Sequence, residues 1–187
     1  MNPSIMACRR LDGENYNGYR VAVEEIPLRF HEIKGIIEGH IEAYRPSAVI
    51  CTGQSGRPSI SVERVALNIA DARIPYNCGL KPTDETLSKS GPVAYFTKLP
   101  YRSVVERLKQ SGIPAVVSNS AGAFGCNQLF YHLMDYLARK EAKFPAGFIH
   151  VPSLPEQVID RGTPSMTVEL ISEAIKIAVE TVTQCIK

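Results

Sequence analysis

Two patterns of apolar residues alternate along the chain: short unbroken runs, and stretches in which apolar residues recur every three or four positions. The first pattern is typical of buried strands and the second of helices with one buried face. The runs predict strands over residues 21–26, 48–52, 62–69, 113–117 and 146–151, with a short extended segment at 93–96. The recurring pattern predicts helices over residues 31–44 and 101–111, another that follows Cys126, and a final one opening at Thr163-Pro164.

Strands and helices that alternate in this order predict a single-domain α/β/α sandwich around a mostly parallel, twisted sheet, like that of phosphorylases and hydrolases. A chain of 187 residues is long enough to bury one substantial core, and no linker or repeat divides it. One domain over residues 1–187 is therefore expected. Residues 73–90 are rich in Pro, Gly, Asn and polar side chains, which predicts a long ordered loop.

Composition narrows the classes of function. A formal net charge of +2, without a basic block, argues against nucleic-acid binding. The chain has no apolar run of about 18 residues, so we expect no membrane-spanning segment. Five cysteines at irregular spacing, without a Cys-x-x-Cys pair, argue against a disulfide framework and against a structural zinc site. A cytoplasmic protein is therefore expected.

Cys126 differs from the other cysteines in its position. It follows a predicted strand and a loop of small polar residues, and it directly precedes an amphipathic helix. The unpaired N–H groups and the positive dipole end of a helix N-terminus favour a thiolate, which is the form that attacks carbonyl groups. Cys126 is therefore the candidate nucleophile. The remaining cysteines are expected to be inert or simply packed: Cys8, Cys51, Cys78 and Cys185.

His150 and Glu63 are the candidate partners of this thiol. His150 ends an apolar run before a proline-bracketed loop, and Glu63 interrupts another apolar run, where a buried carboxylate needs a partner. Each also has a structural alternative, because His150 could be satisfied by backbone groups and Glu63 could pair with Arg64 or Arg73. The functional hypothesis is that Glu63 orients His150, which deprotonates Cys126. The other histidines lie on predicted helices and are expected to be structural: His31, His40 and His132.

Three segments surround these candidates: SVERVALNIADARIP at 61–75, SNSAG at 118–122 followed by Cys126-Asn127, and FIHVP at 148–152 followed by LPEQ at 154–157. In this order they resemble the glutamate, cysteine and histidine signatures of the pyroglutamyl peptidase I family, also called pyrrolidone-carboxylate peptidases. The resemblance spans most of the chain.

The resemblance implies a cysteine exopeptidase that removes N-terminal pyroglutamate (5-oxoproline) from peptides through a thioester intermediate. It makes Cys126 the nucleophile, His150 the general base and then the acid, and Glu63 the orienting carboxylate. The oxyanion would be held by the Cys126 backbone N–H, with Arg73 as an auxiliary candidate. No metal and no organic cofactor is implied.

The resemblance also implies an apolar pocket with a few polar contacts to the lactam ring. Phe124 is similar to the family's aromatic wall, Leu28 lies in a segment that borders the pocket, and Gln54 is a polar residue near the site. Gly125 stands where a larger apolar residue is usual, which predicts a wider pocket beside Cys126. Members of the family assemble as homotetramers or dimers, so a homo-oligomer is expected.

One departure from the family pattern concerns the start of the chain. Family members open with a strand and a Phe- and Gly-rich loop before an Asn-Pro-Ser triplet, whereas here Asn2-Pro3-Ser4 follows the first residue. Either the sequence is a shortened form of a longer chain, or the protein lacks part of the pocket. In the second case residues 48–52 are expected to keep an unpaired edge. Two alternative functions stay open. One is a non-catalytic relative that acts as a binding protein. The other is a different α/β hydrolase or a phosphorylase, although no standard phosphate loop is visible.

Overall fold

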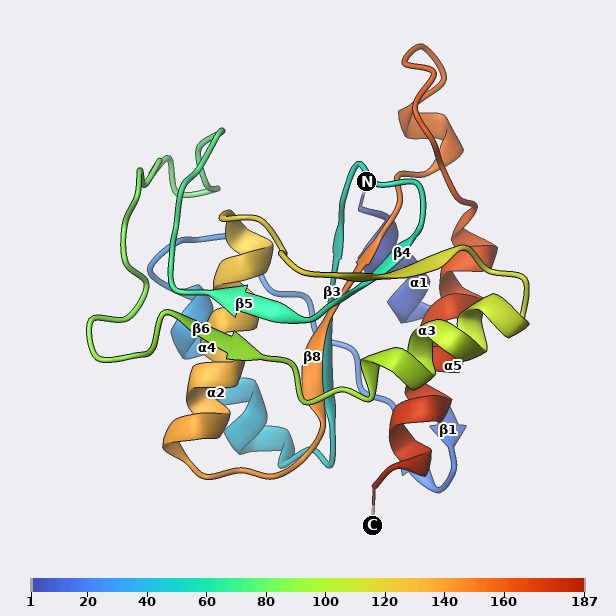
Figure 1. The fold of residues 1–187 in the computed structure, drawn as a ribbon, viewed down its shortest axis with the longest axis horizontal. Coiled ribbons are helices and arrows are strands. Elements are labelled where there is room, and N and C mark those ends of the chain that lie inside the picture. The colour runs from blue at the N-terminus through green and yellow to red at the C-terminus, as the bar shows by residue number, and fades with distance from the viewer. Residues whose placement is uncertain (1, 187) are drawn as a thin grey trace.

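The apolar runs and helical repeats fold into a mixed sheet with helices on both faces, as the computed structural model shows for residues 2–186 (Figure 1). The helices are α1 (Pro3–Arg9), α2 (Ile33–Tyr44), α3 (Tyr101–Gln110), α4 (Gly125–Arg139) and α5 (Val168–Gln184), with a 3₁₀ turn, η1, at Pro155–Gln157. The strands are β1 (Asn15–Tyr16), β2 (Tyr19–Arg20), β3 (Val49–Gln54), β4 (Ile60–Glu63), β5 (Val65–Leu67), β6 (Ala94–Phe96), β7 (Ala115–Ser118) and β8 (Ala146–Val151).

β8 lies inside the main sheet, whose strand order is β3-β8-β4-β7. It runs parallel to β3 and antiparallel to β4, and β4 runs parallel to β7. Two of the three pairings are therefore parallel, and the predicted mostly parallel sheet is confirmed in a mixed form. Every residue of β8 is buried, as expected of a strand that is covered on both faces.

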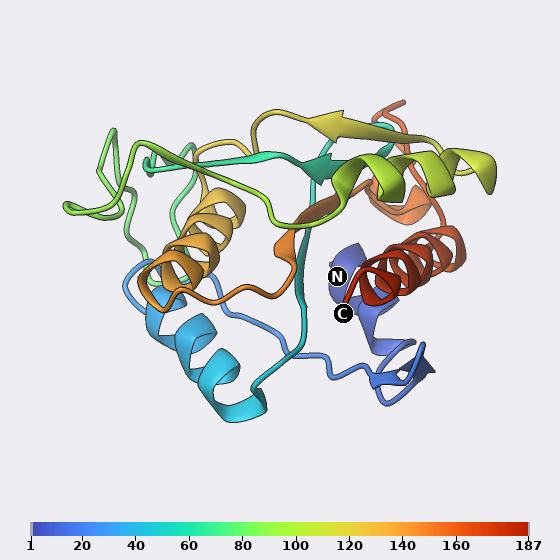
Figure 2. The ribbon, with the colours of Figure 1, turned by 60° about the horizontal axis from the view of Figure 1, so that its bottom comes forward.

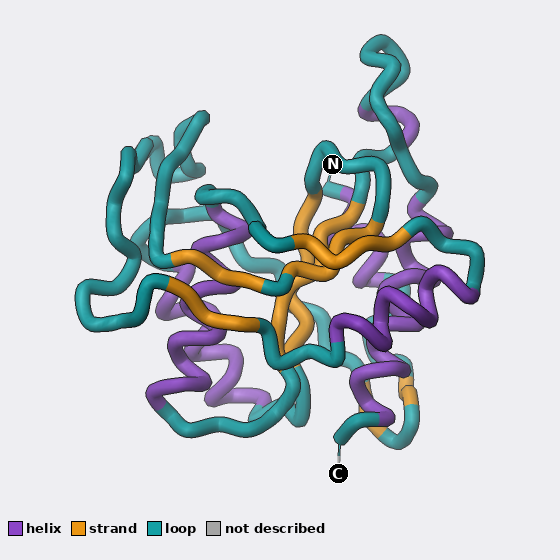
Figure 3. Tube along the Cα trace, in the orientation of Figure 1, coloured by secondary structure: helices purple, strands orange, loops and turns teal. Residues whose placement is uncertain are grey.

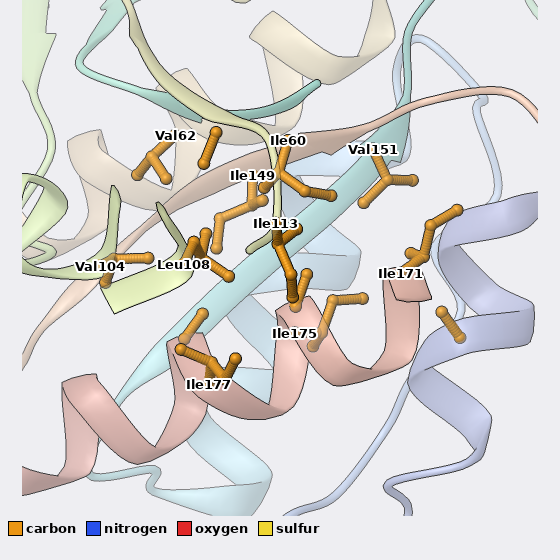
Figure 4. Packing of buried hydrophobic residues seen from close by; sticks show 14 of the residues in the cluster. Ile60, Val62, Val104, Leu108, Ile113, Ile149, Val151, Ile171, Ile175 and Ile177 are labelled. Atoms are coloured by element: carbon orange, nitrogen blue, oxygen red, sulfur yellow. The ribbon is translucent and has the colours of Figure 1, made fainter. Parts of the chain in front are cut away.

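α1, α3 and α5 cover one face of the sheet, and α2 and α4 cover the other (Figures 2 and 3). Neighbouring residues of β8 point to opposite faces. Ile149 joins the apolar cluster that contains Ile60 of β4 and Ile175 of α5 (Figure 4). Phe148 joins the cluster around Phe130 of α4. Among the described residues, no helix is both long and apolar enough to cross a bilayer.

β3 is an edge strand that borders a cavity. Within the described residues it pairs only with β8, and its other edge faces a cavity of about 710 Å³. Residues of α1 and α5 line this cavity, as do residues of α2, the start of α4 and the segment 18–28. The unpaired edge expected beside residues 48–52 is therefore present.

Two predicted strands differ in the structure. Residues 21–26 border the cavity and form no strand. Only Val21 makes backbone hydrogen bonds of the kind found between strands: its N–H donates to Glu14 O, and its carbonyl oxygen accepts from the Gly13 N–H. The predicted strand at 62–69 is broken at Arg64, because its two halves pair with different neighbours. β4 joins the central sheet, whereas β5 pairs with β6.

The final helix begins at Val168 and not at Thr163-Pro164. The Thr167 hydroxyl accepts a hydrogen bond from the Leu170 N–H and caps the helix. Two residues before this cap, Ser165 forms an isolated parallel bridge with Ser153. Residues 164–166 therefore lie before the helix, and the bridge between Ser165 and Ser153 keeps them out of its first turn.

The first helix, α1, and the hairpin of β1 and β2 were missed, although their signals are present in the sequence. Asn2 caps α1 by accepting the Ser4 N–H at 3.0 Å, and Pro3 takes the first helical position. Asn17 and Gly18 adopt φ angles of 51° and 85°, which form the tight turn between β1 and β2. An Asn-Gly pair between tyrosines is a recognised hairpin signal.

Candidate active site

Two neighbouring strands bring Glu63 and His150 together. Glu63 ends β4 and stands opposite Phe148 of β8, two residues from His150. The apolar residues around them bury both strands, which leaves Glu63 0% and His150 4% exposed. His150 Nδ1 lies 2.7 Å from Glu63 Oε1. The imidazole and the carboxyl group therefore form a hydrogen-bonded pair in the interior.

The direction of this hydrogen bond defines the state of the imidazole. A carboxylate can only accept, so Nδ1 carries the hydrogen and Nε2 keeps a lone pair when Glu63 is ionised. The Phe148 ring lies 4.8 Å from the His150 ring, centroid to centroid, and restricts its rotation. An imidazole held in this way can take a proton at Nε2, and the carboxylate then stabilises the imidazolium.

Arg57, which the sequence analysis did not single out, supplies the positive partner of Glu63. Its Nη1 donates to Glu63 Oε1 at 2.8 Å. The predicted partners Arg64 and Arg73 are wrong, because neither makes an ion pair with Glu63 within residues 2–186. Arg64 lies at the break between β4 and β5, and its Nε is buried without a partner. Arg57 reaches Glu63 only because of how the loop after β3 folds. The spacing of residues along the sequence therefore gave no indication of this ion pair.

Cys126 is the second residue of α4. A Cβ atom built on Gly53 would lie 2.8 Å from Cys126 Sγ, so the missing side chain leaves room for the thiol. Gly53 stands opposite His150 across the β3–β8 pair. The thiol therefore lies over the end of β3, beside the strand position of His150. Within the described residues, no hydrogen bond joins Cys126 to His150. In enzymes without bound substrate, the hydrogen bond between a nucleophile and its base is often long and shortens only in the substrate complex.

The environment of Cys126 opposes the thiolate that its position at a helix N-terminus favours. Burial raises the pKa of the Cys126 thiol to about 11, and the negative charge of Glu63 acts in the same direction. Desolvation disfavours the charged form, and here it outweighs the favourable helix N-terminus. The resting group is therefore a thiol, which must give its proton to a base as it reacts.

The cavity beside β3 reaches Cys126. Leu28 fills the space that Gly125 leaves, because a Cβ atom on Gly125 would lie 2.6 Å from Leu28 Cδ2. The predicted widening of the pocket is therefore wrong. The Phe124 ring lies 4.5 Å from the Tyr76 ring, centroid to centroid, which fixes this wall of the cavity. All four predicted pocket residues line the cavity: Leu28, Gln54, Phe124 and Gly125.

The remaining candidates lie apart from this cluster. Arg73 is exposed on the loop after β5. His132 is 4% exposed on α4, and burial, the largest cause, lowers its pKa to about 4, so it packs as a neutral residue. His31 is exposed just before α2, and His40 is partly buried on that helix.

Asn127, beside the nucleophile candidate, anchors the start of α4. Its Oδ1 accepts the Leu67 N–H at 2.9 Å, and its Nδ2 donates to Leu67 O at 2.9 Å and to Ile69 O at 3.0 Å. The side chain is completely buried. It fixes the first turn of α4 to β5 and the residues that follow, and so sets the position of Cys126.

A thiol, an imidazole and a buried carboxylate gathered at one end of an α/β sheet are the parts of a cysteine-dependent hydrolase. The family model described as pyroglutamyl peptidase matches residues 1–185. The chain belongs to the pyroglutamyl peptidase family.

Individual relatives agree with this assignment. The pyrrolidone-carboxylate peptidase of Bacillus licheniformis is 48% identical over 179 residues, which cover 95% of this chain and 83% of that protein. The enzyme of the same name from Bacillus subtilis is 44% identical over 185 residues, 98% of this chain and 86% of that protein. The crystal structure of pyroglutamyl peptidase I from Bacillus amyloliquefaciens has a TM-score of 0.95 at 42% identity, covering 98% of this chain and 88% of that one. A mutant pyrrolidone carboxyl peptidase from Pyrococcus furiosus also has a TM-score of 0.95, at 38% identity, over 98% of this chain and 91% of that one.

Proposed function

We propose that this protein is a cysteine exopeptidase that hydrolyses the bond after an N-terminal pyroglutamate, with Cys126, His150 and Glu63 as its catalytic groups. The observation that carries the proposal is the buried Glu63–His150 hydrogen bond, next to a thiol that opens into a cavity. Family membership supports the reaction, and this geometry supports the roles.

In the first half of the reaction, His150 Nε2 takes the Cys126 proton while Sγ attacks the pyroglutamyl carbonyl carbon. The tetrahedral intermediate collapses when His150 returns this proton to the leaving amine, which departs as the shortened peptide. A thioester remains. Water then attacks the thioester with His150 as the base, and free pyroglutamate and the Cys126 thiol are restored.

Backbone N–H groups at the start of α4 are suited to hold the oxyanion. The first bond within this turn runs from the Gln128 N–H to Phe124 O, so the Cys126 N–H has no partner in the helix. Arg73 stays the candidate for a second donor. It is two residues beyond Asp71, whose N–H donates to Ala123 O at 2.7 Å and ties this loop to the one that leads to Cys126.

The cavity wall suits an uncharged lactam. Phe124 and Leu28 present apolar surface to the cavity, and Gln54 contributes an amide to its lining. The Gln54 Nε2 donates to Ser153 Oγ at 3.0 Å, which fixes the orientation of that amide. A charged α-amino group would lose hydration against this apolar surface of Phe124 and Leu28. We therefore propose peptides that begin with pyroglutamate as substrates.

We also propose a cytoplasmic location and a homo-oligomeric assembly. All five cysteines are unpaired, which suits a reducing compartment. Large exposed apolar side chains offer surface for contact with a second copy, among them Phe96 at 68% and Val93 at 83% exposure. Light scattering of the purified protein measures the assembly, and a monomer at micromolar concentration contradicts it.

The deciding experiment is release of a fluorescent amine from a pyroglutamyl-amide by the purified protein. The prolyl-amide, which has the charged amine and lacks the lactam carbonyl, is the control substrate. We expect turnover of the first substrate only, and its loss in Cys126→Ser. The matched control is Cys185→Ser, which changes an exposed cysteine and is expected to keep full activity. No turnover by the wild-type protein would support the non-catalytic alternative, and full activity of Cys126→Ser would exclude the proposed nucleophile.

A further inference from the structure

We propose that Arg57 is a positioning residue of the active site: its guanidinium holds Glu63 in the orientation that His150 requires and ties this pair to the loop that carries the nucleophile. The inference rests on the proposed function and adds a fourth side chain to its machinery.

The guanidinium of Arg57 joins two parts of the site. Nη1 donates to Glu63 Oε1 at 2.8 Å and to Ser118 Oγ at 2.7 Å. Nη2 donates to the backbone oxygen of Ser120 at 2.8 Å. Ser118 ends β7, and Ser120 lies in the loop between β7 and α4. A planar group with this fixed fork can hold all three oxygens in one geometry, which a lysine ammonium cannot reproduce.

The same oxygen of Glu63 serves both partners. Oε1 lies 2.7 Å from His150 Nδ1 and 2.8 Å from Arg57 Nη1, whereas the buried Oε2 has no partner among the described residues. A rotation of the carboxylate would therefore break both contacts at once. With Arg57 present, Oε1 is the oxygen that faces His150. Without Arg57, the carboxylate loses the charge partner that a buried anion needs, and the two oxygens are no longer distinguished.

The contact to Ser120 O gives Arg57 a second effect. The loop from Ser118 to Phe124 leads directly to Cys126, and it is held at Gly122 by a hydrogen bond to Ser120 Oγ at 3.1 Å. Arg57 therefore fixes the start of the nucleophile loop relative to the Glu63–His150 pair. Its side chain is 39% exposed and is absent from the lining of the cavity. Arg57 therefore contacts Glu63 and the loop outside the substrate cavity and is not expected to touch the substrate. A defect at Arg57 is therefore expected in kcat and not in KM.

The experiment compares Arg57→Met and Arg57→Lys with wild type on the pyroglutamyl-amide. A catalytic group misplaced by about 1 Å can cost on the order of 100-fold in rate, so we expect kcat to fall by about that factor in Arg57→Met. We expect a smaller fall in Arg57→Lys, and a KM within about threefold of wild type in both. The matched control is Arg107→Met, which removes a similarly exposed arginine from its contacts with Glu180 and Gln184. It is expected to retain wild-type kcat.

Two further measurements separate positioning from a general loss of structure. Guanidinium ion added to Arg57→Ala should restore part of kcat, because it can occupy the place of the deleted group. In a double-mutant cycle, Arg57→Met should lower kcat much less in the Glu63→Gln background than in wild type, because both residues act through one contact. If Arg57→Met does not fold, Arg57→Lys and the guanidinium rescue carry the test.

The outcomes separate this inference from the proposed function. An inactive wild-type protein overturns the proposed function and, with it, the role of Arg57. An active wild-type protein with unchanged kcat in Arg57→Met or Arg57→Lys overturns the positioning role alone. Equal losses of kcat from Arg57→Met in both backgrounds, without guanidinium rescue, also overturn it, because Arg57 would then act independently of Glu63.

Discussion

A single added methyl group at Gly53 tests the placement of the nucleophile. In Gly53→Ala, the new Cβ atom would lie 2.8 Å from Cys126 Sγ and 2.9 Å from Phe148 Cζ. Ordinary contacts begin at 3.4 Å, so the thiol would have to retreat by about 0.6 Å and the ring by about 0.5 Å to restore them. Overpacking of this kind costs about 1–3 kcal/mol in the free energy of unfolding. A thiol displaced by this much should also lose about 10- to 100-fold in kcat.

The assay is steady-state turnover of the pyroglutamyl-amide together with urea unfolding. The control is Gly35→Ala on α2, where a Cβ atom meets nothing within 4 Å. This change should leave kcat unchanged and raise the free energy of unfolding by about 0.5–1 kcal/mol, because alanine favours a helix. Gly53→Ala with kcat within twofold of wild type would refute the placement of Cys126 Sγ beside the end of β3.

Three other changes have defined outcomes. Asn127→Ala should lower the free energy of unfolding in urea by about 2–4 kcal/mol, because three partly buried backbone groups lose their hydrogen bonds to Asn127; a loss below about 1 kcal/mol contradicts this role. Gly125→Ala should displace Leu28 and raise KM more than it lowers kcat, whereas an unchanged KM argues against Leu28 as a pocket wall. Burial raises the pKa of Cys126 to about 11 and that of Cys51 to about 12 from the ordinary 9.0. Below pH 9 both thiols stay protonated in the folded and unfolded states, and above it the unfolded chain releases their protons first. Stability should therefore fall as the pH rises from 9 to 11, by about 2 kcal/mol for Cys126, and it should fall by less in Cys126→Ala, as urea unfolding at pH 8 and pH 10 can show.

The sequence predicted those parts of the fold that local pattern determines. The buried strand at 146–151 and the helix at 101–111 were predicted nearly to the residue, because an unbroken apolar run and a helical repeat leave few alternatives. The run 62–69 was predicted as one strand, because a change of pairing partner at Arg64 leaves apolar periodicity intact. The start of α5 was misplaced because Thr163-Pro164 and Thr167 are both acceptable caps, and only the contact with Ser153 decides between them.

Some residues of the candidate site could likewise be predicted from local sequence, and others could not. Cys126, His150 and Glu63 could be proposed because each lies in a recognisable motif at the end of an element. Arg57 could not, because it reaches Glu63 from a loop and its contact depends on how that loop folds. The protonation of Cys126 was also beyond the sequence. A helix N-terminus can be located from residues alone, whereas the desolvation that opposes it depends on the packing around the finished site.

The edge position of β3 has a consequence for hydrogen exchange. Val49 and Ser55 donate their N–H groups to Pro145 and Val151, so alternation along the strand turns the N–H groups of residues 50, 52 and 54 toward the cavity. These three residues are partly exposed, whereas Cys51 and Gly53 are buried. Alternate amides of one short strand will therefore exchange by different routes. One set needs the β3–β8 pair to open, and the other exchanges with water that enters the cavity while the fold stays intact.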